Sequence, residues 1–299
     1  MTGPAAPVLV AGAAGGRQGS TGRHLVDLLL ARGQPLRALV RVDDDRAARL
    51  RGLGAEVVTG DLREIADLVP ALRGVRRAYF TYPVTHGLVD AAGAVAVAAR
   101  EAGVERVVAV SQLAAGPEAG TPHMRQHWVA EQVLDRFGIG AVHLRAGVFF
   151  ENLAVVAEAS GWRELALPLG PADTVLPLVA AADVARVAAG LLLDPGPVDP
   201  VQWLTGEVLS IGEVAAAMGA ALGRDLPYRD VDPEGWRATA VDLYRDDRAV
   251  AHLTALWALF RTIGSGHSLY RVTEVIERVG GAPPGTLADH LRDRLVQPA

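Results

Sequence analysis

The residues best suited to bind a pyrophosphate lie in a glycine-rich segment close to the N-terminus. The sequence GAAGGRQGSTG, from Gly12 to Gly22, follows the apolar run Val8–Ala11 and precedes a helical pattern. Glycines let the backbone turn sharply and approach a phosphate closely, and the first turn of the next helix offers free N–H groups. We therefore expect a dinucleotide here, rather than a glycine-rich connection without a ligand. Two G-x-x-G spacings fit the segment, and the expected contacts are Gly12, Gly15, Gly16, Arg17, Gln18 and Gly19.

Arg41 indicates which dinucleotide this is. It ends the second apolar β run, where an acidic residue would accept hydrogen bonds from the ribose hydroxyls and select NAD. An arginine can instead pair with a 2′-phosphate, so Arg41 favours NADP(H), with Arg17 as a second candidate partner. An exposed strand-end charge is the alternative. The acidic run Asp43–Asp45 would repel a phosphate if it folded back toward Arg41.

Further contacts are expected where later β runs end, because the carboxyl ends of parallel strands share one edge of a sheet. Asp61 follows the third run at the place of an adenine contact, although it is equally suited to cap the next helix. Aromatic residues near such an edge are more often core than pocket. The other expected cofactor contacts are Leu62, Tyr82, Pro83, Gly147 and Phe149, and the expected substrate contacts are Phe150 and Asn152.

Six apolar β runs alternate with amphipathic helical patterns in the first half of the chain. Such alternation predicts a parallel sheet covered by helices on both faces. The expected strands are Val8–Ala11, Leu36–Val40, Glu56–Thr59, Arg77–Thr81, Arg106–Ser111 and Gly140–Arg145. The expected helices are Arg23–Arg32, Arg46–Gly52, Glu64–Arg73, Leu88–Ala102 and Gln126–Phe137.

The second half lacks this regular alternation. It predicts a helix over Ala180–Leu193, a strand over Val201–Leu204, and a helix capped by Ser210 with Glu213 at the capping-box position. We therefore expect an α/β fold: a doubly wound parallel sheet (Rossmann) with a smaller C-terminal α/β substrate lobe. The NADP-binding core would comprise residues 1–152, with 175–206 returning to the core sheet, and the lobe would comprise 153–174 and 207–299.

The composition excludes several classes of function. A formal net charge of −5 argues against a partner that is nucleic acid or an anionic membrane. There is no cysteine among the 299 residues, which excludes disulfides and thiolate metal sites. The first residues lack the basic region of a signal sequence, and no charge-free apolar stretch is long enough to span a bilayer. We expect a cytoplasmic monomer or homodimer whose partner is a small-molecule substrate.

Several segments together resemble the NmrA-like branch of the atypical short-chain dehydrogenases/reductases. The early ones are the glycine turn with Arg17-Gln18-Gly19, Leu39-Val40-Arg41 and Gly60-Asp61-Leu62. The resemblance continues through nearly the whole chain, and the order of the segments is more specific than any one of them. The later segments are His127–Glu131, Leu144–Asn152, Ala182–Ala185, Leu204–Gly206 and Gly281–Pro284.

This resemblance implies a Rossmann domain, NADP(H) binding and a substrate cleft under a small C-terminal lobe. Some members of the family reduce quinones, phenolic precursors or polyketides, whereas others bind the cofactor as redox sensors and do no chemistry. The leading hypothesis is an NADPH-dependent reductase of a carbonyl or quinone in a bulky, aromatic molecule, such as a polyketide ketoreductase in antibiotic biosynthesis. The alternative is a non-catalytic NADP(H)-binding regulatory protein.

The proton chemistry departs from the usual short-chain pattern. Such reductases use a Tyr-x-x-x-Lys pair on the helix after the fifth strand, and this chain has no lysine. His123 and His127 stand at those places, and Ser111 ends the fifth strand. We expect these three to be catalytic, since a histidine can donate a proton near neutral pH. His127 is also expected to contact the cofactor.

The alternative for the two histidines is that they are polar residues of a helix surface beside the cleft. A metal site is disfavoured because no glutamate follows the first histidine. A further alternative is substrate assistance, in which a phenol beside the ketone stabilises the product, as in tyrosine-less ketoreductases of the simocyclinone type.

Overall fold

A seven-stranded parallel sheet forms the centre of the molecule in the computed structural model, which describes residues 5–15, 20–194 and 196–296. The strand order is β10-β6-β5-β4-β1-β2-β3, so the chain winds outward from β1 in both directions. The carboxyl ends of β1 and β4 therefore meet at the point where the winding reverses. The strands are β1 (Val8–Ala11), β2 (Leu36–Val40), β3 (Glu56–Thr59), β4 (Arg77–Phe80), β5 (Arg106–Gln112), β6 (Ala141–Ala146) and β10 (Val201–Leu204).

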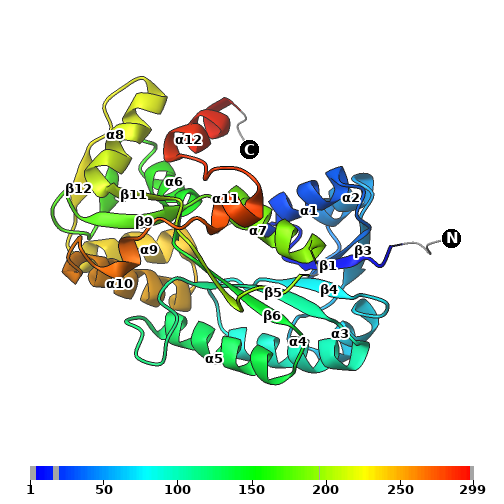
Figure 1. Cartoon of the computed structure of the whole chain (residues 1–299). Helices are drawn as coiled ribbons and strands as arrows, with labels where there is room; N and C mark the ends of the chain where they lie inside the picture. The colour runs from blue at the N-terminus through cyan, green and yellow to red at the C-terminus, as the bar shows by residue number, and fades with distance from the viewer. Residues whose placement is uncertain (1–4, 16–19, 195, 297–299) are drawn as a thin grey trace.

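Helices cover both faces of this sheet, which confirms the doubly wound α/β fold (Figure 1). One face carries α3 (Ile65–Ala71), α4 (Leu88–Ala102) and α5 (Pro122–Arg136), and the other carries α1 (Thr21–Ala31), α2 (Asp45–Gly52), α7 (Ala181–Leu193) and α11 (Val275–Gly280). Two apolar clusters fill the spaces between sheet and helices. Their short side chains, many of them alanines of α4 and α7, allow the helices to approach the sheet closely.

Helix α5 begins earlier than its sequence pattern indicates. The side chain of Thr121 accepts the backbone N–H of Met124, and Pro122 occupies the first helical turn, where its missing N–H carries no cost. The expected start at Gln126 was therefore wrong. As a result, His123 and His127 both lie within the helix, one turn apart.

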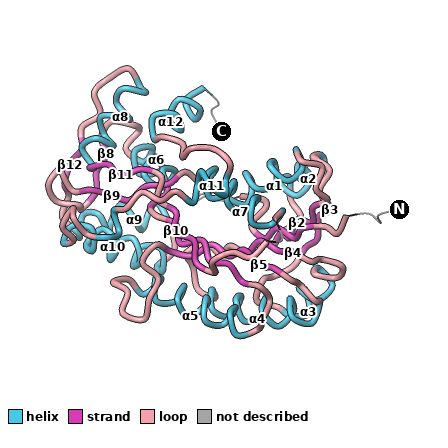
Figure 2. Tube along the Cα trace, in the orientation of Figure 1, coloured by secondary structure: helices cyan, strands magenta, loops and turns pink. Residues whose placement is uncertain are grey.

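A second lobe packs over the carboxyl edge of the sheet (Figure 2). Strands β7 (Val148–Phe149), β9 (Val175–Val179) and β11 (Glu207–Ser210) form one small sheet, and β8 (Leu165–Leu167) pairs with β12 (Tyr228–Asp230). β9 thus joins the lobe sheet, whereas α7 and β10 return to the core. Residues 175–206 were expected to return to the core sheet, and only the part that includes α7 and β10 does so. The lobe helices are α6 (Phe150–Ala159), α8 (Ile211–Leu222), α9 (Pro233–Tyr244), α10 (Asp247–Thr262) and α12 (Leu287–Val296), with a 3-10 turn at Ser268–Tyr270.

The local signals in the lobe explain where its helices begin. Ser210 and Glu213 form the expected capping box at the start of α8. Asp232 and Asp246 cap α9 and α10 in the same manner, each accepting two backbone N–H groups. In the part of the chain that the structure describes, no helix has both the length and the apolar character needed to cross a bilayer.

Candidate active site

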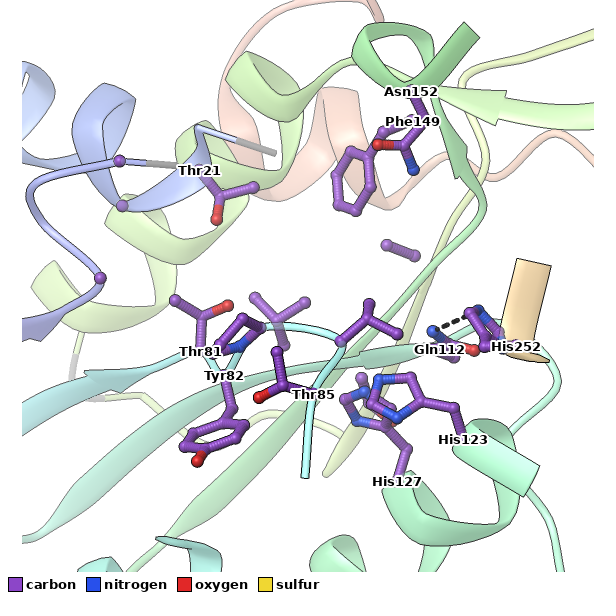
Figure 3. A pocket seen from close by; sticks show the side chains of 18 of the residues that line it. Thr21, Thr81, Tyr82, Thr85, Gln112, His123, His127, Phe149, Asn152 and His252 are labelled. Atoms are coloured by element: carbon purple, nitrogen blue, oxygen red, sulfur yellow. Dashed lines mark hydrogen bonds between the residues drawn. The ribbon is translucent and has the colours of Figure 1, made fainter. Parts of the chain in front are cut away.

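A cavity of about 460 Å³ lies between the sheet edge and the second lobe. The turns after β1, β2, β4 and β5 form its floor, and the start of α5, the β6–α6 connection and one face of α10 form its far walls. Figure 3 shows Thr21 and Thr81 beside the glycine turn, with Phe149 and Asn152 across the cavity from the histidines. The cavity therefore runs from the winding reversal of the sheet to the lobe, and one elongated ligand can contact both.

In the described part of the glycine turn, the backbone geometry allows a ligand to come close to the main chain. Gly12 and Gly15 have φ values of +71° and +70°, a region that disfavours residues with a side chain. A Cβ atom at Gly12 would lie 2.5 Å from Cγ2 of Thr81, and one at Gly22 would lie 2.4 Å from the carbonyl oxygen of Gly12. The glycine turn and the first turn of α1 thus leave no room for a side chain at Gly12 or Gly22. The remaining predicted contacts, Gly16, Arg17, Gln18 and Gly19, lie outside the described residues.

Two arginines after β2 line the cavity at its adenosine end. Arg41 lies where it was predicted, and Arg46, in the first turn of α2, was not predicted. The acidic run between them is neutralised, because Asp44 pairs with Arg46 at 2.7 Å and Asp43 pairs with Arg51 at 2.8 Å. These partners lower the pKa of both aspartates. Asp44 caps α2 and Asp43 binds Arg51, so neither carboxylate folds back toward Arg41.

The residues after β3 and β4 complete this end of the cavity. Asp61 lines it, and its ion pair with Arg63 lowers its pKa to about 2. Helix α3 starts at Ile65 with Glu64 at its N-cap, so the proposed helix-capping role of Asp61 was wrong. The side chain of Asp61 instead accepts a hydrogen bond from the backbone N–H of Arg63. Leu62, Tyr82 and Pro83 all line the cavity, as predicted from their places after the strands.

The β6–α6 connection contributes Gly147 and Phe149 to the opposite wall, and the first turn of α6 contributes Asn152. A Cβ atom at Gly147 would lie 2.5 Å from the carbonyl oxygen of Pro177, which explains the glycine. Phe150 does not line the cavity, so its assignment to the substrate was wrong. It begins α6, where the chain turns from extended to helical, and its side chain is fully buried in the lobe core beside His290.

Three histidines gather at the far end of the cavity (Figure 3). The ring centroids of His123 and His127 are 4.7 Å apart, and those of His123 and His252 are 5.1 Å apart. The three residues are 0%, 6% and 4% exposed, in the order His123, His127, His252. His252 lies on α10, so no spacing in the sequence connects it with the pair on α5, and it was not predicted.

Burial keeps these histidines neutral. Desolvation lowers the pKa of His123 to about 4 and that of His252 to about 3, and it lowers the pKa of His127 well below its ordinary value. These histidines therefore lack the near-neutral pKa on which the expected proton donation depended. Thr121 and the side chain of Gln112 hold His252 by contacts of 3.0 and 3.2 Å to its two ring nitrogens.

Ser111 lines the cavity, but its proton is engaged elsewhere. Its Oγ donates to the carboxylate of Glu131 at 2.6 Å, and Glu131 also accepts Nε and Nη2 of Arg145 at 3.0 and 2.6 Å. Glu131 is only 3% exposed, and Arg145 lies over the ring of Trp203 at 5.7 Å. Toward a ligand, Ser111 can therefore offer only its oxygen lone pairs.

The fold and the cavity define a Rossmann-type α/β protein with a second lobe over the sheet edge. The chain belongs to the NmrA-like family, which matches residues 5–274. It is 30% identical over 278 residues to an NAD(P)H azoreductase from Xenophilus azovorans, covering 92% of this chain and 94% of that protein.

Two further comparisons agree with this assignment. A (4-alkanoyl-5-oxo-2,5-dihydrofuran-3-yl)methyl phosphate reductase from Streptomyces griseus is 30% identical over 244 residues, which cover 80% of this chain and 83% of the relative. The crystal structure of an NADPH-dependent quinone oxidoreductase from Escherichia coli, complexed with NADPH, superimposes with a TM-score of 0.80 at 22% identity. The match covers 97% of this chain and 100% of the E. coli chain, which confirms the fold.

Proposed function

We propose that this protein is an NADPH-dependent reductase that transfers a hydride to a quinone or to a ketone within an aromatic compound such as a polyketide. The observation that carries the proposal is one continuous cavity, which connects the tightly packed glycine turn at the winding reversal with apolar side chains of the lobe. Relatives named as NAD(P)H azoreductase and as a reductase of a furan-type phosphate ester support the reaction class.

The residues at the sheet edge fit a bound dinucleotide. Gly12 is exposed and Gly22 packs directly against its carbonyl oxygen, so the turn passes close to the N-terminus of α1, where a pyrophosphate is favoured. Arg41 and Arg46 can hold a 2′-phosphate, which makes NADP(H) the preferred form. The cofactor would supply the hydride, and the protein's own residues position the substrate and exclude water.

The substrate is expected to be flat and largely apolar. Leu253, Leu256 and Phe260 on α10 face Phe149 across the cavity, and these side chains bind aromatic surface through the hydrophobic effect. Polar side chains such as Asn152 and His252 also line the cavity. A quinone, or a ketone flanked by a phenol, matches both the shape and the limited number of polar partners.

The proton chemistry favours the same substrates. The protein contains no lysine, and its cavity histidines are neutral, so none of them is a strong acid at neutral pH. Quinones and phenol-flanked ketones need no strong acid, because their reduced forms are stabilised oxyanions that water can protonate. A substrate-assisted reaction is therefore consistent with the missing Tyr–Lys pair.

The cofactor preference is tested by Arg41→Ala and Arg46→Ala. Each should weaken NADP⁺ binding about 10- to 100-fold, because a charge-assisted hydrogen bond contributes roughly 1.5–3 kcal/mol, and each should leave NAD⁺ binding nearly unchanged. Fluorescence titration with both nucleotides measures this. Arg49→Ala, on the same helix but outside the cavity lining, is the matched control. Equal losses for NADP⁺ and NAD⁺ would contradict the phosphate role.

The pH profile with a neutral quinone tests the protonation state of the histidines. With menadione, kcat should show no inflection near the ordinary histidine pKa of about 6.5, because burial keeps the cavity histidines neutral on both sides of that value. Steady-state rates between about pH 6 and pH 8 provide the profile. A rate that falls tenfold per pH unit across this range would instead show that a protonated histidine supplies the proton.

A further inference from the structure

His123, at the far end of the cavity, lacks the partners that buried polar groups normally have. Neither ring nitrogen of His123 has a hydrogen-bond partner in the described part of the chain, and the residue is fully buried. The neighbouring Gln126 also leaves its Oε1 unpartnered. Buried imidazole nitrogens without partners cost on the order of 1–3 kcal/mol, so this arrangement is expected to serve a ligand.

Among the residues that the structure describes, no carboxylate forms an ion pair with His123, His127 or His252. Arg248 disfavours the charged form of His123, and His123, His252 and His143, in decreasing order, disfavour that of His127. The nearby acids are occupied elsewhere: Glu131 binds Arg145, and Asp135 accepts a contact of 2.8 Å from His143. The Gln126 amide is the group that raises the pKa of His123, and desolvation outweighs it.

An anionic ligand would reverse this balance. An oxyanion within a few ångströms of His127 favours the charged imidazole, because opposite charges stabilise each other strongly in a site removed from water. Gln112 and Thr121 hold His252 in place, so the wall behind the two α5 histidines stays fixed while a ligand binds. Ser111, whose proton is held by Glu131, can accept a hydrogen bond from a hydroxyl on the same ligand.

We propose that His123, His127 and His252 form a recognition site for an ionised hydroxyl group on the substrate, and that its binding is coupled to the uptake of one proton by the cluster. The substrate class is then a hydroxyquinone or a similar aromatic ketone with an acidic hydroxyl group. The proposal rests on the proposed reductase function and adds the group that the enzyme recognises.

The coupling fixes the direction of the pH dependence. Without a bound anion, the three histidines are neutral above about pH 4. With the anion bound they hold one more proton, so the affinity for the anion should rise about tenfold for each unit by which the pH falls. A neutral quinone should bind with the same affinity throughout this range. Reduction of the quinone consumes a hydride and a proton, and the proton held by the cluster can serve as that proton. When a hydride adds to the quinone and this proton follows, the cluster returns to its neutral form.

The test uses lawsone, a naphthoquinone whose hydroxyl group is ionised at neutral pH, and menadione, its neutral methyl counterpart. Each is titrated calorimetrically into the protein saturated with NADP⁺, in two buffers with different ionisation enthalpies. We expect about one proton taken up per lawsone bound and none per menadione. Bound lawsone should keep the visible absorption of its anion, which places the proton on the protein and not on the ligand.

Variants assign the proton to the cluster. His127→Asn and His123→Phe should each abolish proton uptake and weaken lawsone binding roughly 10- to 100-fold, and the loss should be smaller for menadione, which carries no ionised hydroxyl group. His123→Phe removes nitrogens that have no partner, so it should fold at least as well as the wild type. His267→Asn, at an exposed position outside the cavity, is the control and should leave proton uptake unchanged.

Three outcomes would overturn the proposal: no binding of lawsone, binding without proton uptake, or uptake that persists in both variants. The proposed function fails on a different result, namely the absence of NADPH oxidation with menadione. The two failures are therefore distinguishable, because menadione does not carry the ionised hydroxyl group.

Discussion

Gly22→Ala should weaken NADP(H) binding by roughly 100-fold, which corresponds to about 3 kcal/mol. The added Cβ atom would lie 2.4 Å from the carbonyl oxygen of Gly12 and 2.7 Å from its carbonyl carbon. Because both contacts are with backbone, the turn or the start of α1 must move to relieve them. Thr21, which accepts a hydrogen bond of 2.7 Å from the buried Tyr79, holds the helix in place and so directs the displacement into the turn.

The matched control is Gly93→Ala in α4, where an added Cβ atom meets nothing within 4 Å. That substitution should raise the free energy of unfolding by about 0.5–1 kcal/mol and leave nucleotide binding unchanged. Titration with NADP⁺ and thermal denaturation of both variants separate binding from stability. If Gly22→Ala bound NADP⁺ as tightly as the wild type, the claim that cofactor binding requires the close packing of Gly22 against Gly12 would be contradicted.

Glu131→Ala should lower the free energy of unfolding by about 3 kcal/mol, because removal of one member of a buried ion pair leaves the other charge without compensation. Glu131 holds Arg145 through two hydrogen bonds of 3.0 and 2.6 Å and accepts the Ser111 hydroxyl group. Arg145 is itself mostly buried, with 16% of its side chain exposed. The substitution also frees the hydroxyl group of Ser111 toward the cavity, so the KM for quinones should change as well.

Glu105→Ala is the comparison for a surface pair, since Glu105 binds Arg76 and both side chains are exposed. It should change stability by no more than about 1 kcal/mol. Urea denaturation of the two variants measures the difference. If both substitutions changed the free energy of unfolding by a similarly small amount, the loss of the Glu131 carboxylate would have to be compensated by water or by a movement of Arg145. In that case Glu131 would not be what positions Ser111.

The core of the fold was predictable because its determinants are local. Each parallel strand is an apolar run between turn residues, and β1, β2, β3 and β10 have the predicted bounds. The lobe was harder to predict because its strands are short and pair with distant segments. β9 pairs with β11 and β7 rather than with the core sheet, and its own sequence, VLPLV, contains no signal that distinguishes these two partners.

The candidate site was predictable at the sheet edge and not in the lobe. Arg41, Asp61 and Tyr82 follow strands directly, so their place at the cavity comes from the topology alone. His252 reaches the cavity only because α10 packs across the start of α5, which is a tertiary contact without a sequence pattern. Phe150 was misassigned because the boundary between β7 and α6 decides which of two adjacent aromatic residues faces the cavity.

The central claim is that this protein uses NADPH to reduce a quinone-like substrate. An anaerobic single-turnover experiment tests it most directly, with enzyme and NADPH mixed in equal amounts with menadione, lawsone, a hydroxyanthraquinone ketone or an azo dye. The reductase account predicts the loss of one NADPH per molecule of at least one of these compounds reduced, and a much slower loss with Gly22→Ala. Tight binding of NADPH without its consumption by any of these compounds would contradict the account and favour a non-catalytic redox sensor.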